Sequence, residues 1–225
     1  MPLHGKGMLI VLCEVKPRDE RDLNEWYNRE HIDERVNLPG FHRARRYVAV
    51  RGAPKYLATY ECDTVDDLAT PGYLHLLANQ TEWSRSVMAR FTKFTRLTLR
   101  IQADRTHGVG GAVAVVRFVP DPRNRKALVA WLTDTALPKA IARPGLVGGF
   151  AAENDLDIAH APLAEKSMDL PRADEAEWVV MLEGGDAGTV GAAARAIFTL
   201  PRLKPFGVTA APTVGTYRLL FGNQR

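Results

Sequence analysis

Three residues near the start of the chain carry side chains suited to acid–base chemistry. Tyr27, Glu30 and His31 lie in the stretch NEWYNREHIDERVNLPGF, which is typical of a helix that ends at Pro39-Gly40. Spacings of three and four residues place these side chains on one helix face. In an apolar cleft, His31 could act as a general base, with Glu30 or Glu34 raising its pKa and Tyr27 orienting it or stabilising an oxyanion. We predict His31, Tyr27 and Glu30 to be catalytic.

Polar and aromatic residues downstream of this helix are candidates for substrate binding. The run RARRY includes Arg45 and Arg46, and a guanidinium can hold a phenolate, enolate or carboxylate through two hydrogen bonds. Because side chains alternate along a strand, only one of these two can face the helix, and the sequence leaves open which one. Each candidate also has an ordinary alternative role, as a solvated charge or a core aromatic ring. The predicted substrate-binding residues are Arg46, Arg45, Tyr47, Tyr60, His75 and Trp83.

The chain contains two copies of one pattern. EWYNREHIDERVNLPGF matches AWLTDTALPKAIARPGL without a gap, so that Trp26 aligns with Trp131 and Pro39 with Pro144. Each copy reads as strand, helix, strand, strand, helix, strand, which is the βαββαβ order of a ferredoxin-like unit. Such a unit leaves one face of its sheet bare, and a second copy in the same chain can cover that face.

We therefore predict an α+β fold of two tandem ferredoxin-like units, packed sheet to sheet as an intramolecular α+β barrel. Residues 1–105 form the N-terminal unit with the active site, and residues 106–225 form the C-terminal, mainly structural unit. The polar, glycine-rich stretch ADRTHGVGG is the predicted connection. The second unit has a long loop at 153–177 where the first has only RGAP, and a loop of that length could fold over a pocket.

The two copies differ at the residues that could do chemistry. The tryptophan and the proline–glycine pair are expected to be structural, because both copies have them. Tyr27, Glu30, His31 and Arg46 align with leucine, threonine and two alanines in the second copy. Since the second copy is predicted to fold without these polar groups, their presence in the first favours function over a purely structural, hydrogen-bonded histidine. We predict one active site, in the N-terminal copy.

Composition and charge exclude several classes of function. The 225 residues are 46% hydrophobic and 25% charged, and the net charge of +4 comes from basic residues interleaved with acidic ones. We predict no nucleic-acid partner and no membrane span, because neither a basic stripe with stacking aromatics nor a long apolar run occurs. Two cysteines, Cys13 and Cys62, and the lack of a secretory signal predict a cytoplasmic location. No spacing is typical of a metal site, and no cofactor is predicted.

The block WYNREHIDERVNLPGFHRARRY resembles the signature of the EthD-like branch of the dimeric α/β-barrel superfamily. The features in common are a Trp-Tyr-x-x-x-His helix, a Leu-Pro-Gly-Phe stop and an Ala-Arg-Arg-Tyr strand. The resemblance implies a small-molecule enzyme of aromatic or polyketide metabolism, with an apolar cleft between the sheet and the helices.

From the resemblance and the residues together, we expect a cofactor-independent lyase, isomerase or cyclase. In this reading His31 transfers a proton on a small aromatic substrate. The alternatives on the same scaffold are a cofactor-free monooxygenase, a haem-dependent enzyme and a non-catalytic binder of small molecules. A homodimer that forms through the outer surfaces of the barrel is also expected.

Overall fold

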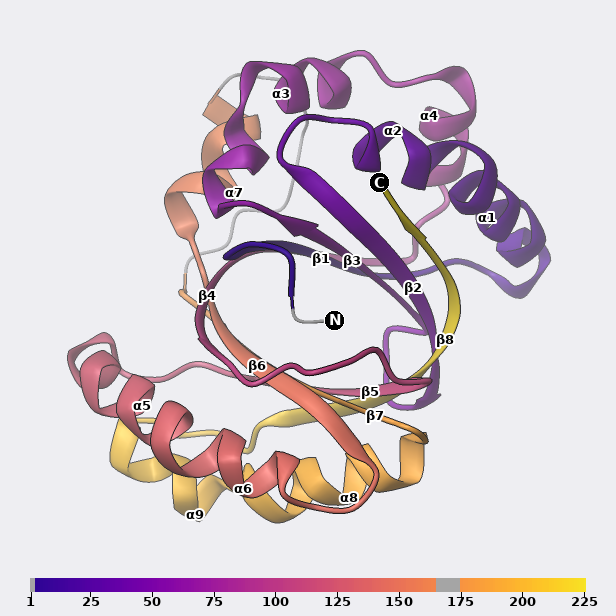
Figure 1. Cartoon of the computed structure of the whole chain (residues 1–225). Coiled ribbons are helices and arrows are strands. Elements are labelled where there is room, and N and C mark those ends of the chain that lie inside the picture. The colour runs from indigo at the N-terminus through magenta and orange to yellow at the C-terminus, as the bar shows by residue number, and fades with distance from the viewer. Residues whose placement is uncertain (1–2, 165–174) are drawn as a thin grey trace.

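Eight antiparallel strands form a closed barrel at the centre of the molecule (Figure 1). The computed structural model describes residues 3–164 and 175–225. In order around the barrel the strands are β1, β3, β2, β8, β5, β7, β6 and β4. Their bounds are β1 Gly7–Glu14, β2 Phe41–Arg51, β3 Tyr56–Cys62, β4 Lys93–Asp104, β5 Ala112–Phe118, β6 Leu146–Asn154, β7 Trp178–Gly184 and β8 Thr213–Gln224.

The strands of each half of the chain lie side by side in the barrel. Around the ring, the first half contributes β4, β1, β3 and β2, and the second contributes β8, β5, β7 and β6 in the same relative order. The halves join where β2 pairs with β8 and where β4 pairs with β6. The predicted α+β fold of two tandem ferredoxin-like units is confirmed, whereas the unit limits of 1–105 and 106–225 stay a prediction.

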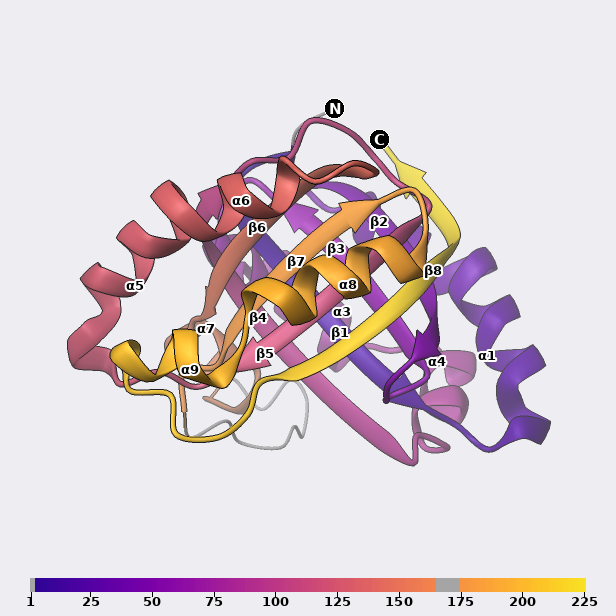
Figure 2. The same cartoon turned by 90° about the horizontal axis from the view of Figure 1, so that it is seen from below.

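Helices cover the outer face of the barrel on two opposite sides (Figure 1). The first helix consists of α1, a π-helical turn (Tyr27–His31) and α2, and it packs over the first half together with α3 and α4. Figure 2 shows α5, α6 and α8 crossing the outer face of β5, β6 and β7. No helix in the described ranges combines the length and the apolarity needed to cross a membrane. The helix bounds are α1 Glu20–Trp26, α2 Ile32–Val36, α3 Pro71–Ala78, α4 Glu82–Met88, α5 Arg125–Trp131, α6 Leu137–Ile141, α7 Leu156–Ala164, α8 Ala187–Ile197 and α9 Leu200–Leu203.

The chain turns from the first helix into β2 at Gly40. This residue has a left-handed backbone conformation, with φ of +83°. An added Cβ would lie 2.4 Å from a carboxylate oxygen of Asp67, so a larger residue would need both a strained backbone and a rearrangement. The tight turn brings β2 back beneath the helix that precedes it.

Hydrophobic side chains fill three layers. One layer lies between the helices and the sheet in each half, and the third fills the interior of the barrel. On β1, Leu9 and Val11 face the helices, while Met8, Ile10 and Leu12 face the interior, as the alternation of a strand requires. The barrel interior is thus a packed core, and the helix-facing side of the sheet is the place where a pocket can form.

The loop predicted at 153–177 differs in part from the structure. β6 continues to Asn154, and Leu156–Ala164 forms α7, which packs against β4 and against a 3-10 turn of the first half, Val65–Ala69. The carboxylate of Asp155 accepts a hydrogen bond from the backbone N–H of Ile158 at 3.2 Å, which favours a helix at this point. Residues 165–174, the rest of the predicted loop up to the approach to β7, lie outside the described residues.

Candidate active site

The predicted catalytic residues lie on the π-helical turn between α1 and α2. The turn spans Tyr27–His31, and Trp26, Tyr27 and His31 all point toward the sheet, with exposures of 1%, 1% and 7%. The second half has an equivalent π-helical turn, Leu132–Ala136. The turn is therefore a property of the repeated fold, and only the first copy has a histidine on it.

Three aromatic rings surround the imidazole of His31. Its ring centroid lies 3.9 Å from that of Trp26, 5.0 Å from that of Tyr27 and 6.4 Å from that of Tyr60. The two tyrosine rings meet the imidazole edge to face, at interplanar angles of 83° and 75°. Contacts on several sides restrict the rotation of the imidazole.

The imidazole of His31 is neutral near physiological pH. Burial lowers its pKa well below the ordinary value, and the guanidinium groups of Arg35 and Arg46 lower it further. The expectation that Glu30 or Glu34 raises this pKa is wrong, because the carboxylate of Glu30 accepts hydrogen bonds from Thr81 and Ser84 and that of Glu34 pairs with Arg35. The Nδ1 atom of His31 is buried and has no hydrogen-bond partner among the described residues.

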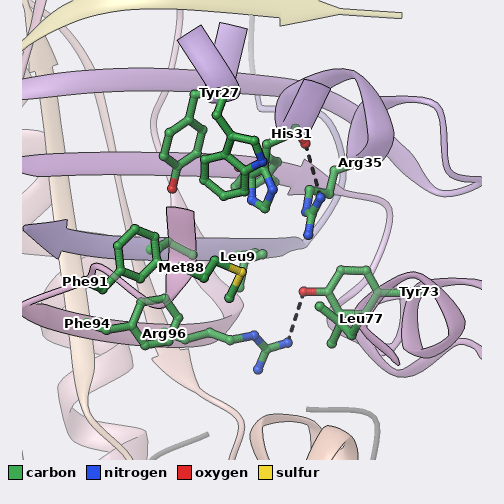
Figure 3. Close-up of a pocket in the computed structure, with 13 residues that line it drawn as sticks. Leu9, Tyr27, His31, Arg35, Tyr73, Leu77, Met88, Phe91, Phe94 and Arg96 are labelled. Carbon is green, nitrogen blue, oxygen red and sulfur yellow. Dashed lines mark hydrogen bonds between the residues drawn. The ribbon is translucent and has the colours of Figure 1, made fainter. Parts of the chain in front are cut away.

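His31 borders a pocket between the helices and the sheet (Figure 3). The pocket contains about 400 Å³ of unfilled space, including the part open to solvent, and about 30 Å³ admits the centre of a water molecule. Figure 3 shows His31 and Arg96 on opposite sides of this space. The lining residues are Leu9, Val11, Trp26, Tyr27, His31, Arg35, Tyr60, Tyr73, Leu77, Met88, Phe91, Phe94 and Arg96.

Three residues of this pocket have buried polar atoms without a hydrogen-bond partner in the described part of the chain. The atoms are His31 Nδ1, the hydroxyl oxygen of Tyr60 and Arg96 Nε. An unpaired buried group of this kind costs about 1–3 kcal/mol. A ligand with matching polar groups, or ordered water in its place, would recover that cost.

Arg46 faces the helices and supports Tyr27 from the sheet side. Its guanidinium carbon lies 4.0 Å from the centroid of the Tyr27 ring, a cation–π contact. The guanidinium donates hydrogen bonds to the side-chain oxygens of Asn24 at 2.9 Å and Asn28 at 3.3 Å. The structure thus answers which of the two arginines of RARRY faces the helix, although Arg46 is held behind Tyr27 and does not line the pocket.

Arg45 and Tyr47 point into the barrel interior, away from the pocket. Arg45 forms ion pairs with Glu61 and Glu183, and all three side chains are almost fully buried. Tyr47 packs among the hydrophobic residues of the interior. Their placement gives them no access to a ligand that is bound beside His31.

The remaining predicted substrate-binding residues divide between the pocket and the surface. Tyr60 lines the pocket. His75 is exposed on α3, where its ring contacts the side chain of Asn79. The indole of Trp83 donates a hydrogen bond to Asp22 at 3.0 Å, outside the pocket.

Glu30, predicted to be catalytic, joins the first helix to α4. One carboxylate oxygen accepts hydrogen bonds from the indole of Trp26 at 3.2 Å, the hydroxyl of Thr81 at 2.6 Å and the hydroxyl of Ser84 at 3.0 Å. These bonds direct the carboxylate away from His31. The geometry favours a structural role for Glu30.

Replacing Glu30 by alanine is expected to lower the free energy of unfolding by about 1–3 kcal/mol, because Trp26 and Ser84 lose a shared acceptor. Urea unfolding of the variant measures the change. The matched control is Glu25→Ala, whose carboxylate pairs with the exposed Arg29 and should contribute at most about 0.5 kcal/mol. A Glu30→Ala protein with wild-type stability would contradict the structural role.

The sequence pattern missed several residues of the pocket. Arg35 follows His31 by one helical turn and donates a hydrogen bond to its carbonyl oxygen at 3.4 Å. Arg96 precedes Leu97 on β4, and Leu97 faces the barrel interior. Because side chains alternate along a strand, this pattern could have predicted that Arg96 faces the helices. Tyr73 comes from α3, and its arrival at the pocket depends on how that helix packs.

Comparisons with known proteins bear on the fold. No protein-family model matches the sequence, and no curated protein sequence is significantly similar to it. A solved structure of an anthrone oxidase-like protein matches with a TM-score of 0.66 at 12% identity, over 98% of this chain and 93% of that one. A putative monooxygenase from Lactobacillus acidophilus matches with a TM-score of 0.58 at 11% identity, over 97% and 96% of the two chains.

A putative monooxygenase from Fusobacterium nucleatum also matches, with a TM-score of 0.57 at 11% identity, over 99% of this chain and 96% of that one. At such low identity the likeness shows the fold alone. These neighbours have the barrel architecture that the strand order displays here. The chain therefore has the fold of these solved structures, with both ferredoxin-like units in one polypeptide.

Proposed function

We propose that the chain is a cofactor-independent enzyme that moves a proton on a small aromatic or polyketide-like molecule, as a lyase, isomerase or cyclase. The observation that carries the proposal is the neutral, buried imidazole of His31 in an aromatic pocket, with a ring nitrogen that has no hydrogen-bond partner in the described ranges. A neutral imidazole can accept a proton, whereas an imidazolium cannot. The second half has Ala136 at the equivalent position of its π-helical turn.

His31 is the proposed general base for a proton next to a carbonyl or on a phenol. The enolate or phenolate that forms needs a hydrogen-bond donor, and the hydroxyl of Tyr60 on the pocket wall, which no described residue pairs with, is suited to that role. The positive charge of Arg46, which contributes to the lowered pKa of His31, also favours an anion at this place. Return of the proton to another atom gives isomerisation, and departure of a leaving group gives elimination.

Tyr27 is proposed to position His31 rather than to react. Burial raises the pKa of its hydroxyl well above the ordinary value, and its ring contacts both His31 and Arg46. The Trp-Tyr-x-x-x-His block that contains these residues supports, as a proposal, placement of the chain in the EthD-like branch.

A cofactor-free monooxygenase is the second candidate function. Solved neighbours are described as anthrone oxidase-like or as putative monooxygenases, and the rings that line the pocket suit a flat aromatic substrate. Both functions begin with removal of a proton by His31, so oxygen uptake distinguishes them. Uptake in step with substrate loss supports the monooxygenase, and full turnover without oxygen supports the lyase or isomerase.

Haem does not fit the pocket as it is built. A haem-ligating histidine needs a free ring nitrogen facing a broad open space, whereas the ring centroid of Trp26 lies 3.9 Å from that of His31. Within the described ranges, no group of three or more histidine, cysteine, aspartate or glutamate side chains could hold a metal ion. The proposed chemistry uses the residues of the chain itself.

Uptake of deuterium from heavy water into 2-tetralone tests the proposal. Exchange of the acidic protons beside the carbonyl of this aromatic ketone needs only removal and return of a proton. The wild-type protein is expected to accelerate the exchange above the rate in buffer. A non-catalytic binder would leave the rate of deuterium exchange at its value in buffer.

A further inference from the structure

The guanidinium of Arg96 borders the pocket and has no carboxylate partner in the described part of the chain. Its Nη2 atom donates a hydrogen bond to the hydroxyl oxygen of Tyr73 at 3.3 Å, and its carbon lies 5.8 Å from the Tyr73 ring centroid. Its Nε atom is buried and has no hydrogen-bond partner among the residues that the structure describes. A guanidinium has five N–H donors, so Arg96 has donors left for a ligand.

The strand β4 fixes the place of Arg96. The residue pairs in register with Val11 of β1, and both side chains face the helices. Figure 3 shows the guanidinium across the pocket from His31, with the rings of Phe91 and Phe94 along one side. A flat molecule that lies along these rings has Arg96 near one end and His31 near the other.

The charges around the pocket favour an anion. Arg35 is neutralised by Glu34, whose carboxylate lies 2.6 Å from it. Arg46 contacts neutral groups, as Arg96 does, so two positive charges stand without a carboxylate partner among the residues described. The imidazole of His31 is neutral and adds no charge. A carboxylate on the ligand would complete this arrangement.

We propose that the pocket selects an aromatic carboxylate and that Arg96 anchors the carboxylate group. A planar guanidinium donates two parallel hydrogen bonds to a carboxylate, and the hydroxyl of Tyr73, which accepts from Arg96, keeps its own proton to donate. This inference rests on the proposed function, which makes this pocket the substrate site. Space for the ring comes from shifts of the half-buried Met88 and Phe91, since an unbranched methionine adapts readily.

Calorimetric titrations with 2-naphthoate and 2-naphthamide test the anchor, because these molecules match in shape and differ in charge. The wild-type protein is expected to bind the carboxylate at least about tenfold more tightly than the amide. Arg96→Gln is expected to reduce this preference to about twofold or less while it keeps binding the amide. The matched control is Arg100→Gln, which removes the same charge from the same strand, where Arg100 pairs with Asp155 at 2.8 Å outside the pocket. This control should keep the wild-type preference.

Equal binding of the two molecules by the wild-type protein, no binding of 2-naphthoate, or an unchanged preference in Arg96→Gln would overturn the anchor. Tyr73→Phe is a second variant, which keeps the ring and should weaken the binding of 2-naphthoate alone. His31→Gln separates this inference from the proposed function, because it should keep the charge preference while it loses proton transfer. A preference for 2-naphthoate without deuterium exchange upholds Arg96 as the anchor and rejects His31 as the base. Deuterium exchange without that preference upholds His31 as the base and rejects Arg96 as the anchor.

Discussion

Replacing His31 by glutamine is expected to slow deuterium exchange into 2-tetralone by about 10²–10⁴-fold, because an amide cannot take the proton that the imidazole accepts. Glutamine is polar and similar in size, so the surrounding rings stay packed. His75→Gln is the matched control, since it makes the same change at an exposed position on α3 and should leave the rate unchanged. If His31→Gln keeps the wild-type rate, His31 is not the base.

The pH dependence of this exchange follows from the lowered pKa of His31. The neutral form that accepts a proton is present above the pKa, which lies well below the ordinary value of 6.5 in the folded protein. After subtraction of the buffer rate, exchange is therefore expected to stay constant from mildly alkaline pH down through 6.5 and to fall only at lower pH. A rate that already falls by half at 6.5 would show that the imidazole is not desolvated as the structure indicates.

Replacing Arg45 by alanine is expected to lower the free energy of unfolding by about 3–5 kcal/mol, because it leaves the buried carboxylate of Glu183 without its cation, whereas Glu61 keeps its ion pair with Arg43. Arg45 belongs to β2 of the first half, and it pairs with Glu183 on β7 of the second half and with Glu61 on β3. The side chains of Arg45, Glu183 and Glu61 are 3%, 5% and 1% exposed. Urea unfolding measures the loss.

A matched ion pair on the same scaffold provides the control. Arg117 and Glu177 also pair through two hydrogen bonds of 2.8 Å, but their side chains are 22% and 20% exposed. Arg117→Ala should therefore cost about 1 kcal/mol or less. The double variant Arg45→Met with Glu183→Gln should recover part of the loss, because both buried charges are removed together. If Arg45→Ala lowers the free energy of unfolding by no more than Arg117→Ala does, the buried ion pairs of Arg45 do not stabilise the contact between the two halves.

The repeat in the sequence was sufficient to predict the barrel, because two copies of one strand order must cover each other's bare sheet face. The local course of β2 was not predictable in the same way. Between Phe41 and Arg43 the pairing of β2 with β3 shifts register, and Phe41 packs on the helix side with Ala44. Simple alternation would place Phe41 on the same side as Arg43. A bulge adds a residue on one strand only, and no pattern in that strand alone reveals it.

For the candidate site, comparison of the two copies grouped Tyr27 and His31, which the structure brings into contact. The same comparison could not give the direction of the Glu30 carboxylate. Glu30 has nearly the same helical spacing from Tyr27 as His31 has, but hydroxyl groups of Thr81 and Ser84, far along the chain, bind it. Side-chain directions that depend on such distant partners are set by tertiary packing rather than by local pattern.

An NMR titration of the histidine rings, with and without 2-naphthoate, tests whether His31 is the neutral base of a ligand pocket. The signal of His31 is assigned by its loss in His31→Gln. The ring is predicted to stay neutral to a pH well below 6.5, and bound 2-naphthoate is predicted to shift the signals of His31, because the aromatic rings of the ligand reach the His31 end of the pocket while Arg96 holds the carboxylate. A His31 that titrates at or above 6.5, or whose signals do not respond to the ligand, would contradict this role.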